Sequence, residues 1–227
     1  MKRSKKKNRG IRVLGSVIVA IALAVAAYFA YRYNYLFHFK FTDEHFGIER
    51  KRSSIDADND GIEDYEDVLL SAKEYIATNP KYKSEYYENG YPDDEYGVCT
   101  DVVGFAFLNA GYNLRELVDE DIRNHPEDYA IDKPDSKIDF RRVVNLKVYF
   151  DHTAESLTTD YNDYEAWQAG DIIIWDGHIG LISEHRNRKG IPFVYHHASA
   201  IQASYEEDVI EAYGEILGHY RLKDTGE

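Results

Sequence analysis

The sequence predicts an α+β fold in which helices pack on an antiparallel sheet, preceded by a single transmembrane helix. The first observation is a basic N-terminal block next to a long apolar run. The second is a pair of segments in the middle of the chain whose apolar residues have helical spacing. The third is a set of short segments rich in Ile, Val, Trp and Phe near the end of the chain. Helices that precede strands, rather than alternate with them, indicate an α+β layout.

The N-terminal segment has the composition of a membrane anchor. Residues 11–30 are almost wholly apolar, and six of the first ten residues are Lys or Arg. About 20 apolar residues are enough for a helix to cross the hydrocarbon core of a bilayer. Aromatic residues come next, as at an outer interface: Tyr28, Phe29, Tyr31, Tyr33 and Tyr35. The positive-inside rule then predicts a single-pass protein of the cell membrane with its C-terminal part extracytoplasmic.

A cleaved signal peptide is the alternative for this segment. Val25-Ala26-Ala27 resembles a cleavage site, although the apolar stretch is long for the apolar region of a signal peptide. Both interpretations place the rest of the chain outside the cytoplasm.

Charge divides the chain sharply. Eight of the 27 Lys and Arg lie in residues 1–32, where there is no Asp or Glu. The remaining 19 basic residues against 41 acidic ones leave a net charge of −22 on residues 33–227. Such a domain lacks a surface that would neutralise phosphates, so we expect no nucleic acid partner. With a single cysteine, no intramolecular disulfide is possible, and a free thiol outside the cell calls for a chemical explanation.

Periodicity and capping signals predict the helices of the extracytoplasmic part. We expect helices at Asp64–Ala77, at Thr100–Ala110 with Gly111 ending it, and after Asn113, with Glu116 completing a capping box. Residues 78–98 are predicted as loop and residues 125–145 as irregular, while 146–150 fits either a strand or a helix. The predicted strands are Ile172–Trp175, Ile179–Ser183, Phe193–His196 and a fourth near His219–Leu222.

An acidic loop precedes the first of these helices and has the spacing of a twelve-residue calcium loop. Positions 1, 3, 5, 7, 9 and 12 are Asp56, Asp58, Asp60, Ile62, Asp64 and Asp67, with Gly61 at position 6. Hard oxygen ligands of this kind suit Ca²⁺, with Ile62 contributing its backbone carbonyl. Position 12 departs from the pattern, because a Glu usually binds there with both oxygens.

The loop resembles the single calcium loops of dockerins and thrombospondin type 3 repeats as much as a paired EF-hand. A second loop to pair with it is absent from the sequence. We expect calcium in a structural role, tying the linker to the C-terminal domain; a chance acidic turn is the alternative. No organic cofactor is expected.

The single cysteine lies where a nucleophile would lie. Cys99 begins the predicted helix, and the helix dipole together with a nearby imidazole lowers the pKa of a thiol. His178, between glycines at the start of a later strand, is the candidate base. A third polar residue has to orient that imidazole, and His196 and His197 are the two candidates. A buried, inert cysteine is the alternative.

Four segments occur in an order that resembles the NlpC-type cell-wall peptidases of the papain-like superfamily, and more closely the domain-of-unknown-function 1287 family. They are Gly97–Val103, Trp167–Ile173, Gly177–Gly180 and Val194–His197. That family also shows an Asp-Phe-Arg-Arg element and a terminal Gly-His-Tyr-Arg, which here are Asp139–Arg142 and Gly218–Arg221. The resemblance covers roughly residues 70–222.

The resemblance implies a papain-like hydrolase in which Cys99 is the nucleophile, His178 the general base and His196 the third polar residue. His197 falls where close relatives often have Asn, so the two adjacent histidines can exchange roles. It also implies that the backbone N–H of Cys99 helps to form an oxyanion hole and that Tyr87 lends a hydroxyl. Asp101 either orients substrate or caps the helix. A zinc site at Cys99, His178 and His196 is a weaker alternative, because no close-spaced ligand pair supports it.

The resulting organisation has four parts: residues 1–32 as cytoplasmic stub and anchor, 33–54 as juxtamembrane linker, 55–77 as calcium loop and helix, and 78–227 as the hydrolase domain. The expected activity is hydrolysis of an amide bond, with peptidoglycan or another peptide as substrate. An acyltransferase with the same thiol and a calcium-stabilised binding module with an inactive site are the alternatives. The histidines at 125, 152, 185 and 219 are predicted as surface or packing residues.

Overall fold

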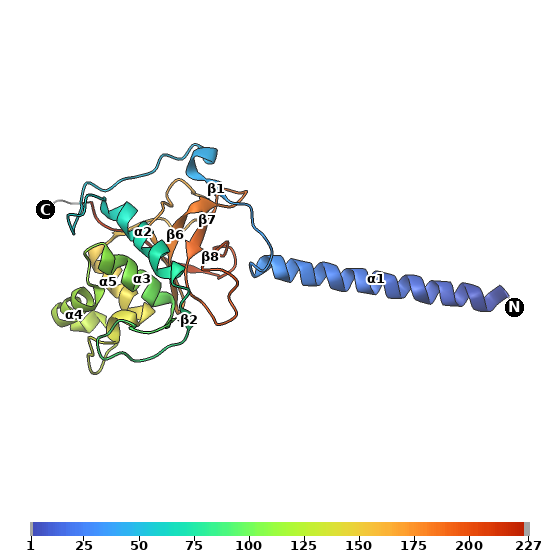
Figure 1. Cartoon of the computed structure of the whole chain (residues 1–227), viewed down its shortest axis with the longest axis horizontal. Helices are drawn as coiled ribbons and strands as arrows, with labels where there is room; N and C mark the ends of the chain where they lie inside the picture. The colour runs from blue at the N-terminus through green and yellow to red at the C-terminus, as the bar shows by residue number, and fades with distance from the viewer. Residues whose placement is uncertain (1, 225–227) are drawn as a thin grey trace. The chain divides into compact units, whose positions relative to one another are not determined.

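The computed structural model describes residues 2–224, with side chains described from Arg12 onward. The chain forms two units, one ending at His38 and the other beginning at Phe39. Each unit is described by itself (Figure 1).

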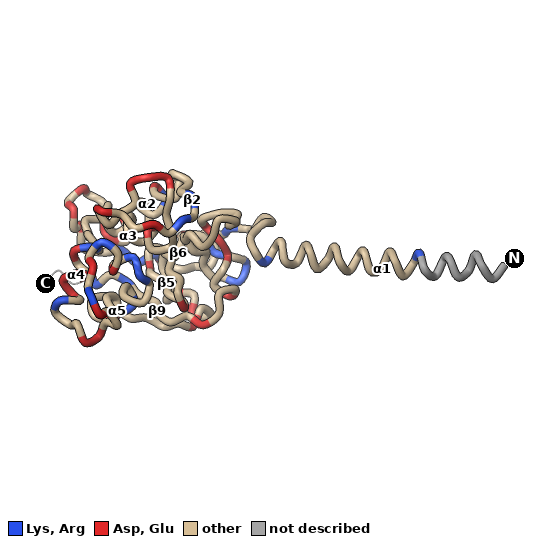
Figure 2. The backbone as a smooth tube through the Cα atoms, turned by 90° about the horizontal axis from the view of Figure 1, so that it is seen from below, with Lys and Arg blue, Asp and Glu red and all other residues tan. Residues whose placement is uncertain are grey.

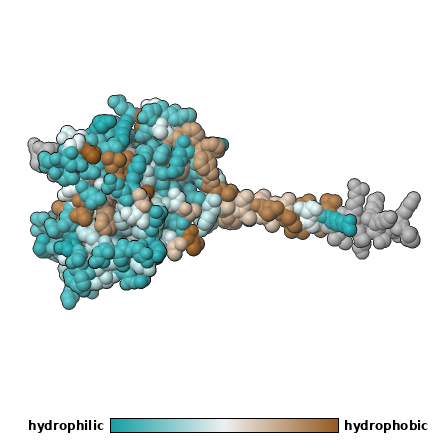
Figure 3. Space-filling model, viewed as in Figure 1, coloured by the Kyte–Doolittle hydropathy of each residue, from teal (hydrophilic) through white to brown (hydrophobic). Residues whose placement is uncertain are grey.

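The first unit is a single helix, α1 (Lys2–Arg32). Within it, Arg12–Arg32 comprises 21 residues with a mean hydropathy of 2.5, and its side chains are exposed. Figure 3 shows apolar residues along its length. At 1.5 Å per residue this stretch is about 30 Å long, which matches the hydrocarbon core of a bilayer. By length and composition, α1 is therefore able to cross a membrane.

The second unit contains a seven-stranded sheet. Its order is β4 (Glu155–Ser156), β9 (Ile216–Arg221), β5 (Ile172–Trp175), β6 (His178–Arg186), β7 (Pro192–Tyr195) and β8 (Glu206–Glu207), and β1 (Phe41–Thr42) also pairs with β6. All of these pairings are antiparallel. The expected α+β class with an antiparallel sheet is confirmed.

The central strands are buried on both faces. Ile172 and Ile174 of β5 pack in the larger core with the helices, whereas Ile173 and Trp175 pack on the other face with Trp167. Because both faces are covered, β5 and β7 read as continuous apolar runs rather than alternating ones. The apolar run Ile172–Trp175 was predicted as a strand, and it forms β5.

Four helices lie together beside the strands of this unit in Figure 1: α2 (Asp64–Ala77), α3 (Cys99–Asn109), α4 (Leu114–Asn124) and α5 (Val143–Thr153). Helix α3 packs against α2 on one side and β6 on the other. The segment 146–150, which fitted either a strand or a helix, lies in α5. Its Leu146 and Phe150, four residues apart, are buried in the larger core, so tertiary packing selects the helix.

Several predicted irregular segments contain short elements. A parallel pair of two-residue strands, β2 (Lys81–Tyr82) and β3 (Tyr96–Gly97), lies within the predicted loop. Short 3₁₀ helices occur at η2 (Pro126–Asp128) and η3 (Asp139–Arg141). Asn113 precedes α4, but its side chain makes no capping hydrogen bond, contrary to the expected capping box.

The segment expected as a linker, 33–54, contributes to the sheet. It contains β1 and a 3₁₀ helix, η1 (Asp43–Phe46). Asp43 accepts from the buried Arg186, whose guanidinium also bonds the carbonyls of Tyr164 and Trp167. A charged side chain buried to this degree needs such partners. The compact unit therefore begins well before the acidic loop.

Two buried ion pairs join sequence segments that are far apart. Arg141 of η3 binds Asp101 of α3 through two bonds of 2.7 and 2.9 Å. Arg221 of β9 binds Asp171 through two bonds of 2.7 and 2.6 Å, and His219 lies 2.9 Å from the same carboxylate. These pairs connect the Gly97–Val103, Asp139–Arg142, Trp167–Ile173 and Gly218–Arg221 segments, which gives those segments a structural role.

Candidate active site

Cys99 is the first residue of α3, so the thiol lies at a helix N-terminus, as the sequence predicted. Asp101 closes the helix end, because its Oδ2 accepts the backbone N–H of Val98 at 2.8 Å. Of the two roles expected for Asp101, the structure shows helix capping. The thiol faces the start of β6, where it interacts with the backbone N–H of Ile179.

The pKa of the Cys99 thiol is raised, whereas the sequence predicted that it would be lowered. Burial raises the pKa of Cys99 to about 11, and the nearby Asp101 carboxylate adds to the increase. The N–H groups of Ile179 and Thr100 oppose this effect without cancelling it. The thiol of this state is therefore protonated at neutral pH, so sulfur attack on a carbonyl requires an acceptor for its proton.

His178 opens β6 directly after the turn that joins it to β5. Gly177 in that turn has a φ of +65°, a conformation that glycine adopts at little cost. Gly180, two residues later, has no room for a side chain, since a Cβ there would lie 2.5 Å from Val194 and 3.2 Å from the Cβ of His196. This close approach of β6 and β7 brings His178 next to His196.

The two imidazoles are in direct contact. Nε2 of His178 lies 2.9 Å from Nδ1 of His196, and both rings are buried. Burial, followed by the neighbouring His196 and His197, lowers the pKa of His178 to about 3, which keeps its ring neutral. His178 Nδ1 makes no hydrogen bond among the described residues, so this nitrogen is the one available to a substrate or to the thiol.

Glu207 of β8 lies behind His196 and was absent from the sequence prediction. Its Oε2 is 3.3 Å from His196 Nε2, and both side chains are at least nine-tenths buried. Gln202 Nε2 is also 3.4 Å from that nitrogen, but its two hydrogens are directed to the carbonyls of His196 and Ser204 at 3.1 and 2.6 Å. The Glu207 carboxylate is therefore close enough to His196 Nε2 to act on it electrostatically, and no hydrogen bond joins the two groups.

The pair supplies a base in one of its tautomers, the one with the His196 proton on Nε2 beside Glu207. With that proton on Nε2 of His196, its Nδ1 is a lone-pair acceptor. His178 must then donate from Nε2, which leaves its Nδ1 unprotonated. In this tautomer, His178 is thus an imidazole whose free nitrogen is a base.

Two aromatic rings enclose the His178 imidazole. Tyr213 stacks on it at 4.9 Å, and Trp175 lies on it at 5.8 Å. Burial, then the charge of Glu207, raises the pKa of Tyr213 to about 12, so its hydroxyl stays protonated. A cavity of about 460 Å³ opens beside the thiol and is lined by residues that include Cys99, Tyr82, Trp175 and Leu217.

The structure separates the two adjacent histidines after β7. His197 faces away from His178 and lies edge-to-face against Tyr82 and Tyr205, at 5.2 and 5.1 Å. Its buried Nδ1 has no partner among the described residues, and it lines a second cavity of about 730 Å³. Tyr82 borders both cavities.

Tyr87 does not occupy the role that the resemblance implied. It is buried, and its hydroxyl donates to Asp94 at 2.9 Å, while Arg141 lies over its ring. The upstream tyrosine that lines the Cys99 cavity is Tyr82.

The acidic loop forms a compact cluster. Ligand oxygens of Asp56, Asp58 and Asp60 lie within 4.8 Å of one another. The Asp56 carboxylate accepts the backbone N–H groups of Asp60 and Gly61 at 3.1 and 2.9 Å, which curls the loop around it. Gly61 has a φ of +97°, which explains glycine at the sharp turn. Ile62 comes next within the same turn and donates to Asp60 at 2.8 Å.

The remaining predicted ligands connect the loop to the helices. Asp64 accepts from the backbone of Ala57 at 2.9 Å and from the hydroxyl of Tyr112, which comes after α3. Burial, together with the charges of neighbouring aspartates, raises the pKa of Asp67 to about 6, although Ser71 donates to it. The loop therefore holds several aspartate carboxylates close together.

The four histidines predicted as surface or packing residues have polar partners. His125 and His152 both contact Asp121, His185 contacts Glu206, and His219 contacts Asp171. Sequence spacing gave no signal for His152 or His219, whose partners lie 31 and 48 residues away.

Comparison with known proteins places the chain in a family. A family model described as "Domain of unknown function (DUF1287)" matches residues 69–222. The chain belongs to the DUF1287 family. It is also 36% identical over 152 residues to the "Uncharacterized protein YijF" of Escherichia coli (strain K12), an alignment that covers 63% of this chain and 72% of the relative. No solved structure matches the chain.

The DUF1287 region contains Cys99, both contacting histidines and Glu207. The acidic loop at 56–67 ends just before it, and β1 and η1 lie further toward the N-terminus.

Proposed function

We propose that this DUF1287 protein is a cysteine hydrolase of the NlpC-type papain-like superfamily that cleaves an amide bond outside the cytoplasm. The observation that carries the proposal is the contact of a neutral His178 with His196, which has Glu207 behind it, while the Cys99 thiol interacts with the backbone N–H of Ile179, the residue next to His178. A nucleophile, a base and a group that orients the base are the minimum for covalent catalysis of acyl transfer.

The proposed chemistry depends on the tautomers. The Cys99 sulfur attacks the amide carbonyl as His178 Nδ1 takes the thiol proton, and backbone N–H groups at the start of α3 stabilise the oxyanion. His178 returns the proton to the leaving amine, and a thioester remains on Cys99. Water then attacks the thioester with His178 as base, which releases the acid and restores the thiol.

Peptide cross-links or stem peptides of peptidoglycan are the proposed substrate. The support is the resemblance to cell-wall peptidases and the N-terminal helix, which is long and apolar enough to hold the enzyme at the membrane. Two cavities share Tyr82 in their lining, and Cys99 lines one of them, which offers space for a substrate beside the thiol.

The test is release of free amino groups from purified peptidoglycan by the full-length protein in detergent, with calcium present. Wild type should release them, Cys99→Ala should not, and His178→Ala should be slower by on the order of 10²- to 10⁴-fold. Equal release by wild type and Cys99→Ala would show that this wall substrate is not cleaved at the thiol. An added amine that becomes incorporated into product would identify the acyltransferase instead.

The raised pKa of the Cys99 thiol favours one alternative, a surface binding module with an inactive site. Iodoacetamide separates the two. If His178 is the base, Cys99 in wild type should react at pH 7 at least about tenfold faster than in His178→Ala, because the imidazole accepts the thiol proton during attack. Equal, slow rates in both proteins would support the binding module.

We propose that the acidic loop binds Ca²⁺ through the residues from Asp56 to Asp67. The support is the convergence of Asp56, Asp58 and Asp60 and the concentration of charge around the buried Asp67. Six to eight oxygen ligands are typical for this ion, and water completes the set where side chains do not. Because Asp64 also holds the Tyr112 hydroxyl, calcium would tie the loop to the helices that carry Cys99.

Chelation of calcium should lower thermal stability. At calcium concentrations of about ten to a hundred times the dissociation constant, binding contributes about 1.4–2.7 kcal/mol, so excess EDTA should lower Tm by about 3–10 °C. Asp58→Ala should have the low Tm with or without calcium, whereas the exposed control Asp132→Asn should keep the calcium response. A Tm in wild type that does not respond to calcium would contradict the site.

A further inference from the structure

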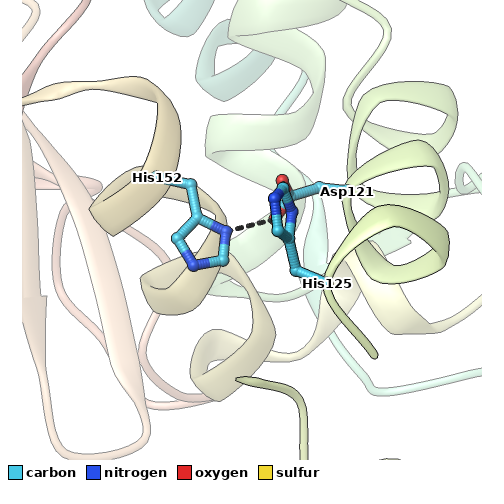
Figure 4. A group of neighbouring side chains, drawn as sticks. All are labelled: Asp121, His125 and His152. Carbon is cyan, nitrogen blue, oxygen red and sulfur yellow. Dashed lines mark hydrogen bonds and ion pairs between the residues drawn. The ribbon is translucent and has the colours of Figure 1, made fainter. Parts of the chain in front are cut away.

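A second cluster of metal-ligating side chains lies between α4 and α5, on residues that the proposed hydrolase does not use. Asp121 and His125 are one turn apart at the end of α4, and His152 lies in the last turn of α5 (Figure 4). Both imidazoles present Nδ1 to the Asp121 carboxylate, at 3.1 Å from His125 and 2.7 Å from His152. We propose that this cluster binds a divalent transition-metal ion of the zinc class.

The spacing of the ligand atoms suits one ion. All three lie within 4.8 Å of one another. Bonds of about 2.0–2.1 Å to a tetrahedral Zn²⁺ place ligand atoms roughly 3.3 Å apart, which lies within the observed range. Two imidazole nitrogens and one carboxylate favour Zn²⁺, Co²⁺ or Ni²⁺ over Ca²⁺ and Mg²⁺, which prefer oxygen.

Outer contacts of the kind found around metal sites are also present. Nε2 of His152 lies 3.4 Å from Asp128, so a proton on that nitrogen has a carboxylate partner when Nδ1 binds a metal. The Tyr129 hydroxyl donates to Asp121 and orients the ligand carboxylate. An imidazole binds a metal through Nδ1 when its proton is on Nε2, and both Nδ1 atoms already face the Asp121 carboxylate.

The surroundings of the cluster carry partial negative charge, and one side of the cluster is open to solvent. The C-termini of α4 and α5 meet at the cluster, and helix C-termini carry partial negative charge. The Asp121 side chain is only 9% exposed, whereas that of His125 is 48% exposed. Three protein ligands leave a coordination position for water or another ligand on this open side.

Cobalt titration of the full-length protein tests the site by visible absorption of the bound ion. The thiol is removed as a ligand by Cys99→Ser, and excess calcium occupies the acidic loop. We expect one equivalent of Co²⁺ to bind and Zn²⁺ to displace it. His125→Gln, at a partly exposed position, should weaken binding by on the order of 100-fold, and Asp128→Asn by about tenfold.

The comparison variant is His185→Gln, because His185, Glu184 and Glu206 form another group of side chains that could hold a metal ion. Its metal affinity should equal that of the parent protein. Absence of saturable cobalt binding, or loss of binding in His185→Gln but not in His125→Gln, would overturn the proposal. Because the titration is carried out without a functional thiol, its result is independent of whether the protein is a hydrolase.

Discussion

Replacement of Glu207 by leucine is expected to lower kcat for amide hydrolysis by on the order of 10²- to 10³-fold, with a much smaller change in KM. Glu207 does not line the Cys99 cavity; it acts through His196, whose Nε2 it faces at 3.3 Å. Without the carboxylate, His196 loses the negative charge that favours a proton on Nε2. His178 can then adopt the tautomer with a protonated Nδ1, which cannot accept the thiol proton.

The conservative variant distinguishes this positioning role from a structural one. Glu207→Gln retains a partially negative oxygen beside His196 Nε2, so it should keep part of the rate that Glu207→Leu loses. The rate of Cys99 alkylation at pH 7 should fall in parallel with kcat, while Tm reports any loss of fold. A leucine variant with lowered Tm but unchanged alkylation rate and kcat would show that Glu207 only supports packing.

Removal of the Asp101 carboxylate is expected to destabilise the fold by about 3–5 kcal/mol. Asp101→Ala leaves the Arg141 guanidinium buried without its charged partner, since both side chains are at most 1% exposed. The same substitution removes the acceptor for Val98 N–H at the start of α3. At about 2–4 °C per kcal/mol, Tm should fall by about 6–20 °C, measured by thermal unfolding with calcium present.

Two further variants isolate the cause. Asp119→Ala breaks an exposed pair with Arg123 and should cost less than about 1 kcal/mol. Combining Asp101→Leu with Arg141→Met removes both buried charges, so the double variant should be more stable than Asp101→Ala alone. An Asp101→Ala protein as stable as Asp119→Ala would contradict the buried-charge explanation.

The division of charge between the N-terminal helix and the rest of the chain can be read from the sequence, and the structure shows it too. Figure 2 shows acidic residues at many places in the unit that begins at Phe39, and α1 nearly uncharged over its described part. The lengths of α2 and β5 equal those predicted, and Cys99 and His178 begin elements that were predicted to start one residue later. These features depend on local spacing, capping and apolar periodicity, which a sequence displays directly.

Other features required contacts between distant residues. Whether 146–150 formed a strand or a helix, and which of His196 and His197 contacts His178, depended on packing that local patterns do not encode. The partners of His196 and Asp121 on other elements could not be read from spacing, because sheet pairing and helix packing bring them together. Burial of the Cys99 thiol also reversed the expected direction of its pKa shift. The sequence by itself determined elements such as α2 and β5 and the candidate residues Cys99 and His178. Burial and long-range contacts, which exist only after folding, decided the pKa shifts of these residues and their partners.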